Sequence, residues 1–253
     1  MFALILMMVT FAQVRFEPNA IDTHWIGIPL PPCFVNAGAC YGHELGTDEI
    51  GRDILARLTH GGLVSLGLAL IAAVLTLVFG IIAGMISRFG GSIPRFIVQR
   101  FAAAVSCFPP WAFMLVMIAI GTTGPRSIVS AFVVATLAAL LLWPRVSEIV
   151  SVASDAHSTV AVLLNQVVLD WTQMIALFAT IDFVGLGIQP PTPSWGNMLH
   201  NFGENVTIAW WAAVFPPLCL CGAILVIEIL RRLLFAQVGS PSKREQLLNQ
   251  LNY

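Results

Sequence analysis

Charged side chains are scarce in this chain, and that scarcity decides its class. Only 10% of the 253 residues are Asp, Glu, Lys or Arg, whereas soluble domains average about 25%. Hydrophobic residues make up 58% of the chain, and its mean hydropathy is +0.87. The composition therefore predicts an integral membrane protein. Its fold should be all-α and polytopic, because backbone that crosses lipid must satisfy its own hydrogen bonds.

Several functional signatures are also missing. A net charge of −1 offers no basic surface for nucleic acid. The sequence has no GxxxxGK[ST] loop to bind nucleotide phosphates, and neither HExxH nor GxSxG occurs. Asp170, Asp182, His157 and His200 are scattered over different sides or depths of the predicted bundle. We expect no enzymatic activity, no catalytic residue, no metal and no cofactor, so any energy source must belong to a partner.

Apolar runs supply the predicted transmembrane helices. Crossing a hydrocarbon core of about 30 Å takes roughly 20 apolar residues. Five segments meet or approach this length, namely 63–87, 96–120, 128–143, 160–185 and 208–235. The first 14 residues are apolar too, but as a helix they would span only about 21 Å. We predict about six transmembrane helices, of which the first is truncated.

Basic residues orient this arrangement. Eight of them fall on the side of the C-terminus and four on the other side, so the positive-inside rule places the C-terminus in the cytosol. The chain then divides into a truncated first helix, an extracytoplasmic segment with an amphipathic helix, a transmembrane core and a cytosolic tail. These parts cover residues 1–14, 15–62, 63–235 and 236–253.

The extracytoplasmic segment ends in LGTDEIGRDILARL, which has the pattern of an amphipathic helix. Thr47 or Asp48 can cap a helix that starts near Glu49. Asp53 and Arg57 would form an i,i+4 pair away from the apolar face. That face carries Ile50, Ile54, Leu55 and Leu58. We predict a helix that lies along the membrane surface and leads into the first long span. Capping and surface charge alone would also explain its polar residues.

A second polar break, GLGIQPPTPSWGNML over 185–199, separates two apolar runs. Non-helical backbone at membrane depth must lie at a surface or line a cavity. Pro190, Pro191 and Pro193 favour a stiff extended connector, because proline fixes φ. We expect Trp195 to plug this connector against the helix bundle and the turn to hold the outer mouth of a pathway. A merely rigid turn is the alternative.

Acidic residues also occur inside predicted spans. Asp170 and Asp182 lie twelve positions apart, about three helical turns and within some 120° of one face. Intramembrane carboxylates are costly, so lining of a translocation pathway is the functional hypothesis. The alternative is that Asp170 is solvated near the cytosolic end while Asp182 hydrogen-bonds a neighbouring helix. Glu228 should pair with Arg231 or Arg232, one turn later.

Two cysteines stand close together in the extracytoplasmic segment. Cys33 and Cys40 are seven positions apart and can form a disulfide in an oxidising compartment. A metal site that adds His43 to these thiolates is the weaker alternative, because structural metal sites use four ligands. The cysteines of the spans should be ordinary small apolar side chains; they are Cys107, Cys219 and Cys221.

Three stretches together resemble a known family. LGTDEIGRDILARLTHG, GMISRFGG and FVGLGIQPPTPSWGNML followed by AWWAAVFPP are similar to the permease subunits of bacterial ABC importers for dipeptides, oligopeptides and nickel, in particular the second permease of each system. The resemblance runs from about residue 19 to 216 with one internal gap, and it implies a type I ABC importer permease fold. It also implies an outer gate or scaffold motif at Gly46, Thr47, Asp48, Gly51, Arg52 and Asp53, and an outer-mouth turn at Gln189, Pro190, Pro191, Pro193, Trp195 and Gly196.

The same resemblance implies partners and a location. A second homologous permease would complete the pathway, two cytosolic ATPase subunits would drive it, and an extracytoplasmic solute-binding protein would deliver the substrate. Membrane lipid would surround the spans, and no nucleic acid is expected. The chain would be a multi-pass protein of the bacterial inner membrane that carries peptides or a related small solute such as nickel.

The cytosolic part departs from this family. Members carry a Glu-Ala-Ala coupling helix between the fourth and fifth spans, which docks on an ATPase, but residues 143–166 hold no such motif. Glu148, Asp155 and His157 are the candidate remnant of that contact. Two interpretations stay open. The chain is a working permease whose partner supplies the coupling, or it is a degenerate permease that acts as a non-transporting scaffold or assembly component.

Overall fold

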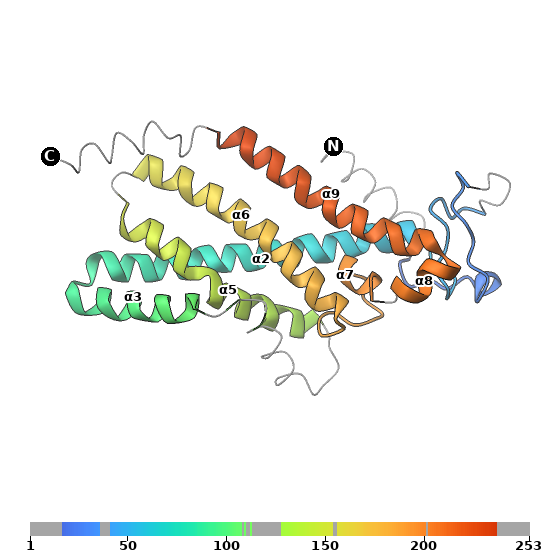
Figure 1. The fold of residues 1–253 in the computed structure, drawn as a ribbon, viewed down its shortest axis with the longest axis horizontal. Helices are drawn as coiled ribbons and strands as arrows, with labels where there is room; N and C mark the ends of the chain where they lie inside the picture. The colour runs from blue at the N-terminus through green and yellow to red at the C-terminus, as the bar shows by residue number, and fades with distance from the viewer. Residues whose placement is uncertain are drawn as a thin grey trace. The chain divides into compact units, whose positions relative to one another are not determined.

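The computed structural model describes residues 17–35, 41–107, 109, 112, 128–153, 156–200 and 202–236. Over these residues the chain is helical, with two isolated β-bridges and no strand. The elements are η1 (Thr23–Trp25), α2 (Ile54–Phe89), α3 (Ser92–Ser106), α5 (Ile128–Ser151), α6 (Ala156–Phe183), α7 (Trp195–Met198), α8 (Phe202–Ile208) and α9 (Trp210–Leu234) (Figure 1). The predicted all-α class is confirmed.

Three of the described helices are long and apolar enough to cross a membrane. They are α2, the part of α6 from Ser158 to Phe183, and α9. A polytopic membrane protein is therefore confirmed, with fewer spans among the described residues than the six predicted. The predicted first helix over 1–14 and the second half of the predicted span 96–120 fall almost entirely outside the described residues.

The start of α2 corrects the prediction for the amphipathic segment. The helix begins at Ile54 rather than near Glu49, and it continues without a break to Phe89, so the described residues from 41 to 53 form no separate surface helix before the first long span (Figure 1). The cap is Asp53, whose Oδ1 accepts a hydrogen bond from Ala56 N at 2.7 Å. Asp48 instead accepts hydrogen bonds within the turn before the helix.

Other helix boundaries differ as well. α5 continues past its predicted end at Trp143 to Ser151, although Pro144 lies within it. Residues 152–155 alone connect α5 to α6, so no separate helix fits between them. The predicted span over 208–235 corresponds to α9, which begins after Ala209 and ends at Leu234.

The chain forms two compact units. The first comprises Met1–Ala69, Leu115–Val133 and Ile175–Ala223, and the second comprises Leu70–Met114, Val134–Met174 and Ile224–Tyr253. The described core of the first unit gathers the start of α2, the α7 turn and the start of α9. Its buried members are Ile54, Leu58, Trp195, Met198, Ala209, Trp211, Ala212 and Ala223.

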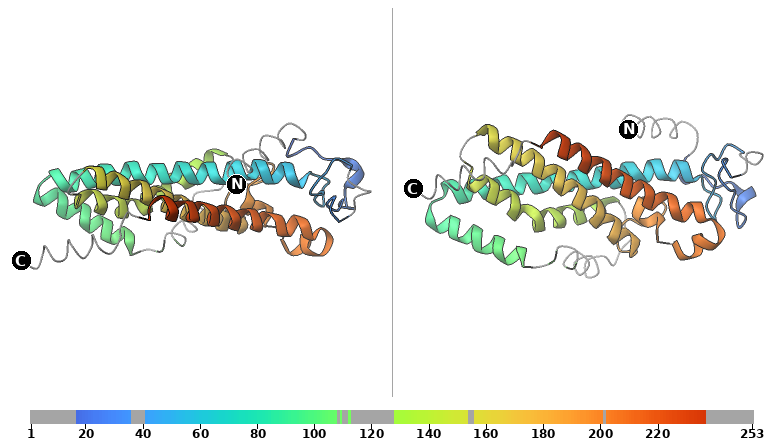
Figure 2. Two further views of the ribbon diagram at one scale, coloured as in Figure 1. Left: turned by 90° about the horizontal axis from the view of Figure 1, so that it is seen from above. Right: turned by 45° about the horizontal axis from the view of Figure 1, so that its top comes forward.

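In the second unit, small residues let helices approach closely. α2 ends at a glycine pair, and α3 folds back from it (Figure 2). On the same stretch of α2, Gly84 faces Val150 of α5, where an added Cβ would lie 2.5 Å from the valine Cβ. Close approach at small residues is the usual packing of helices in membranes.

The predicted pairing of Glu228 is confirmed with both arginines, at 2.6 Å to Arg231 and 2.8 Å to Arg232.

Gly84→Ala should destabilise the second unit, because its methyl group would overlap Val150. Overpacking of this kind costs about 1–3 kcal/mol, which corresponds to roughly 2–12 °C in Tm for a protein of this size. The matched control is Gly67→Ala on the same helix, where an added Cβ meets nothing within 4 Å. Melting of the detergent-purified protein measures both. Equal Tm values for the two variants would contradict the close contact.

Candidate functional site

The motif at residues 46–53 forms a tight turn that is held by backbone contacts. Gly46 has φ +79°, and a Cβ there would overlap the carbonyl oxygen of Leu30. Thr47 is fully buried, and its Oγ1 accepts a hydrogen bond from Leu30 N at 2.8 Å. Its carbonyl oxygen in turn accepts from Trp211 Nε1 at 2.9 Å. The conformation of this turn is therefore fixed from both sides.

Asp48 organises the centre of the motif. Its Oδ1 accepts hydrogen bonds from Ile50 N at 3.1 Å and Arg52 N at 2.9 Å, and its Oδ2 accepts from Arg52 Nε at 2.7 Å. Gly51 lies at φ +83°, against the carbonyl oxygen of Asp22, where a side chain would not fit. Asp48 thus closes the turn and neutralises Arg52 at once.

Asp53 pairs with a histidine, so the predicted ion pair with Arg57 is wrong. Asp53 Oδ2 lies 2.8 Å from His43 Nδ1, and Asp22 Oδ2 lies 3.8 Å from His43 Nε2. The hydrogen bond to Asp53 raises the pKa of His43 above its ordinary value, against the opposing effect of burial. Arg57 instead has Asp48 as its nearest carboxylate, at 3.9 Å.

Of the two cysteines in the predicted disulfide, the structure describes only Cys33. Cys33 is disulfide-bonded, whereas Cys107, Cys219 and Cys221 are free. Cys40 lies outside the described residues. Within the described part of the chain, no group of three His, Cys, Asp or Glu side chains is arranged to hold a metal ion.

Asp182 anchors the proline-rich turn. Its Oδ1 accepts a hydrogen bond from Ile188 N at 2.8 Å, and its Oδ2 accepts from Ser194 Oγ at 2.5 Å. This corrects the alternative in which Asp182 bonds a neighbouring helix, because the partners belong to the turn that follows its own helix. Ser194 then caps α7 in a capping box with Asn197. The connector is therefore helical at its end rather than extended throughout.

Trp195 locks this turn onto the start of α2. Its side chain is 5% exposed, its Nε1 donates to the carbonyl oxygen of Leu58 at 2.8 Å, and its backbone N donates to Ser65 Oγ at 3.1 Å. Gly62 makes room for the ring, because a Cβ there would lie 2.7 Å from Trp195 Cζ2. Gly196 meets the carbonyl oxygen of Ala179 in the same close way, with an added Cβ 2.6 Å from it. The expected burial of Trp195 is found.

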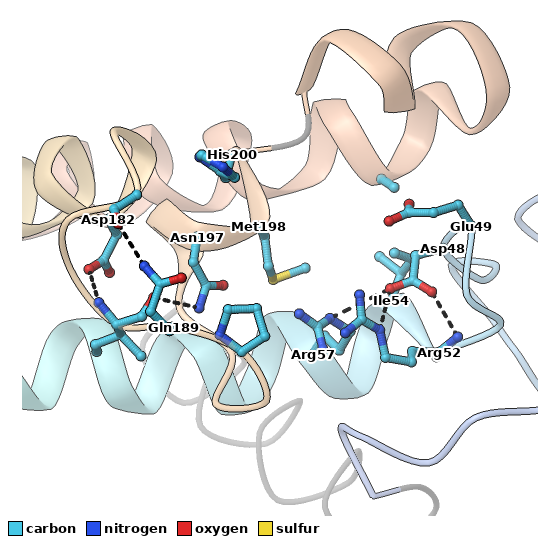
Figure 3. A pocket seen from close by; sticks show the side chains of 14 residues that line it. Asp48, Glu49, Arg52, Ile54, Arg57, Asp182, Gln189, Asn197, Met198 and His200 are labelled. Atoms are coloured by element: carbon cyan, nitrogen blue, oxygen red, sulfur yellow. Dashed lines mark hydrogen bonds and ion pairs between the residues drawn. The ribbon is translucent and has the colours of Figure 1, made fainter. Parts of the chain in front are cut away.

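A cavity of about 80 Å³ lies between the two predicted motifs (Figure 3). Asp48, Arg52 and Arg57 line it from one motif and the start of α2. Asp182 and the turn complete it with Gln189, Pro190, Asn197, Met198 and His200. Residues about 140 positions apart in sequence, whose roles were predicted separately, thus share one polar cavity.

The other predicted site residues lie elsewhere. Asp170 is fully buried and accepts a hydrogen bond from Gln166 Nε2 at 2.8 Å, so the alternative in which it is solvated is wrong. It does not line the cavity. Glu148 is exposed on α5. Asp155 lies outside the described residues, and the described part of the chain does not include the side chain of His157.

Comparison with known proteins identifies relatives. No protein-family model matches the chain. The di/tripeptide transport system permease protein DppC of Pseudomonas aeruginosa is 28% identical over 220 residues, which is 79% of this chain and 72% of the relative. The dipeptide transport system permease protein DppC of Escherichia coli is 29% identical over 250 residues, 90% of this chain and 82% of the relative. A putative peptide permease protein of Brucella suis is 29% identical over 243 residues, 85% and 76% of the two chains.

The chain is a homologue of bacterial peptide-transport permeases. This confirms the resemblance that the motifs carried. It also fits the described helices, of which three can span a membrane.

Sequence reasoning missed several residues that build the site of this permease homologue. Arg57 was expected in a surface ion pair, but it is 4% exposed and lines the cavity. Ser194 and Asn197 connect Asp182 to α7. The adjacent glycines at positions 61 and 62 were the available signal, because two glycines within an apolar helix often mark a close contact.

Asp182→Ala should release the turn over residues 185–198. The substitution leaves Ile188 N–H and Ser194 Oγ–H without their buried acceptor, at a cost of about 1–3 kcal/mol. Hydrogen exchange or limited proteolysis should show the loss as faster exchange or cleavage in that turn. The control is Thr180→Val, because Thr180 is exposed on the same helix and bonds only the carbonyl oxygen of Ala176. Unchanged protection in Asp182→Ala would contradict the anchoring role.

Stability of the segment over residues 41–53 should fall at alkaline pH. Because folding raises the pKa of His43, the stabilisation is complete below the ordinary value of about 6.5 and is lost as the pH rises through the higher folded value. Protease resistance of residues 41–53, measured from pH 6 to pH 9, should decline accordingly. His43→Gln should flatten this decline, whereas His60→Gln, on α2 outside the pair with Asp53, should leave it intact. A pH response that survives His43→Gln would assign it to another group.

Proposed function

We propose that this chain is a permease subunit of an ATP-driven importer of short peptides in the bacterial inner membrane. The observation that carries the proposal is similarity to peptide-transport permeases along 79–90% of the chain. Helices able to cross a membrane support it. The chain performs no covalent chemistry; it forms a translocation path with a second homologous permease.

The remaining parts of the importer follow from this role. Two cytosolic ATPase subunits supply energy, and an extracytoplasmic binding protein delivers the peptide. The C-terminus lies in the cytosol, so the motif turn, the proline-rich turn and the cavity between them face the outside. There they act as a scaffold that fixes the outer end of α2 and the mouth of the path. Nickel or another small solute is the competing cargo.

A second function is favoured by one observation. Residues 152–155 alone join α5 to α6, which leaves no place for a coupling helix of the family type. A permease without that contact could persist as a non-transporting scaffold. The retained outer site favours transport, because Asp48, Asp53 and Asp182 each keep a full set of hydrogen bonds there.

The importer should be recoverable as a complex. Affinity purification of the chain from its native membrane should yield a second permease and two ATPases. Reconstituted with the binding protein, the complex should hydrolyse ATP faster with a dipeptide than without, and nickel should not replace the dipeptide. Recovery of the permease without ATPases would instead establish the scaffold.

The same preparation tests the short α5–α6 connection. Insertion of a family-type coupling loop between Glu148 and His157 should increase dipeptide-stimulated hydrolysis if the missing contact limits coupling. A loop of equal length made of Gly and Ser is the matched control, because it adds chain without a docking helix. If the two insertions give equal hydrolysis, the loss of the coupling helix is not what limits coupling.

A further inference from the structure

Arg57 is a buried cation that is only partly paired with an acceptor. Its side chain is 5% exposed, and the nearest carboxylate oxygen, Asp48 Oδ2, lies 3.9 Å from its Nε. Among the described residues, its Nη1 has no hydrogen-bond partner. A guanidinium keeps its charge and has five N–H donors, and burying such a group is costly unless its donors are paired. The site therefore holds unused hydrogen-bonding capacity.

Asp48 cannot supply what Arg57 lacks. Its Oδ1 already accepts from two backbone N–H groups, and its Oδ2 is bound by Arg52 Nε at 2.7 Å. A closer approach of this carboxylate to Arg57 would break the turn that precedes α2. The carboxylate of Asp48 is thus already engaged by the turn and by Arg52.

An unused acceptor lines the same cavity. Glu49 Oε2 is buried and has no hydrogen-bond partner among the described residues. In the described part of the chain, four buried side-chain atoms lack a partner, on Glu49, Arg57, Ser87 and Asp170, and the first two of these residues line this cavity. Figure 3 shows both side chains beside Asp48.

The cavity has room for a ligand group. Its volume of about 80 Å³ exceeds the roughly 30 Å³ that one water occupies in the liquid. Ile54, Met198 and Ala212 contribute an apolar wall. A simple anion would accept from Arg57 but would leave Glu49 Oε2 without a donor. A group that carries a carboxylate and a neighbouring N–H donor satisfies both unused atoms.

We infer that the cavity binds the C-terminal residue of a short peptide, with Arg57 Nη1 donating to the terminal carboxylate and Glu49 accepting from the last amide N–H. This inference rests on the proposed function, because it names the part of the peptide that the permease itself recognises. A free amino acid offers related chemistry, with a carboxylate beside an ammonium group, and the test distinguishes the two.

Ligand-dependent melting of the purified, detergent-solubilised chain tests the site. Glycylglycine should raise Tm by about 3 °C at ten times its Kd. Glycylglycine amide, which lacks the carboxylate, should have no effect. Glycine tests the free amino acid, and a shift equal to that of glycylglycine would overturn the assignment to a peptide. No shift with glycylglycine at 100 mM, a concentration on the order of ten times a weak Kd, would overturn the site.

Substitution separates binding from structure. Arg57→Met keeps most of the side-chain volume and removes the donors. Its Tm without ligand should be unchanged or higher, and its response to glycylglycine should disappear. A lower Tm with an intact response would show that Arg57 is only structural. Arg88→Met, at the far end of the same helix, is the matched control and should respond like the wild type.

A second variant keeps the test decisive if Arg57→Met does not fold. Glu49→Gln retains a neutral acceptor, so it should weaken the response to glycylglycine several-fold without abolishing it. An unchanged response would exclude Glu49 from the site.

Melting also separates the inference from the proposed function. Import of peptide without a ligand shift refutes the site alone, whereas a ligand shift without import refutes transport alone.

Discussion

The contact between Trp195 and the glycines at positions 61 and 62 of α2 is the constraint on which the candidate site depends. Gly61 and Gly62 lie against Ser194 and Trp195, at separations that a Cβ on Gly62 would not allow. The indole also donates to Leu58 O, a carbonyl group near the start of α2. Without this contact the proline-rich turn would have no fixed position against the helix, and the cavity would lose one of its walls.

The carboxylates of the site accept hydrogen bonds from backbone N–H groups as well as pairing with charged side chains. Asp48 binds two backbone N–H groups, Asp53 binds one, and Asp182 binds one. Hydrogen bonds to an ionised acceptor are roughly twice as strong as neutral ones, so each carboxylate fixes a turn that has no regular secondary structure. Because these acceptors are already engaged, little negative charge remains for Arg57. Arg57 Nη1 lacks an acceptor because the carboxylate of Asp48 is used to hold the turn.

The sequence predicted the class of fold, and it predicted that the two polar motifs matter. It did so because apolar runs and proline-rich breaks are local signals. It misplaced the start of α2, since Thr47, Asp48 and Asp53 are all competent caps, and the choice among them is made by tertiary partners. Thr47 bonds Leu30, which lies 17 positions earlier in the chain. No pattern within the motif reveals this partner.

The length of α2 explains how a polar site can exist on a membrane helix. Its 36 residues extend about 54 Å, whereas the hydrocarbon core is about 30 Å thick. Arg57 and Arg88 are 31 residues apart on this helix, about 46 Å along its axis, so both can lie outside the hydrocarbon while an uncharged stretch crosses it. In that arrangement the first turns of α2 would lie in the polar layer rather than in the hydrocarbon. A helix that began only at residue 63, as the apolar run alone predicted, would carry no such turns and would leave Arg57 on a separate element.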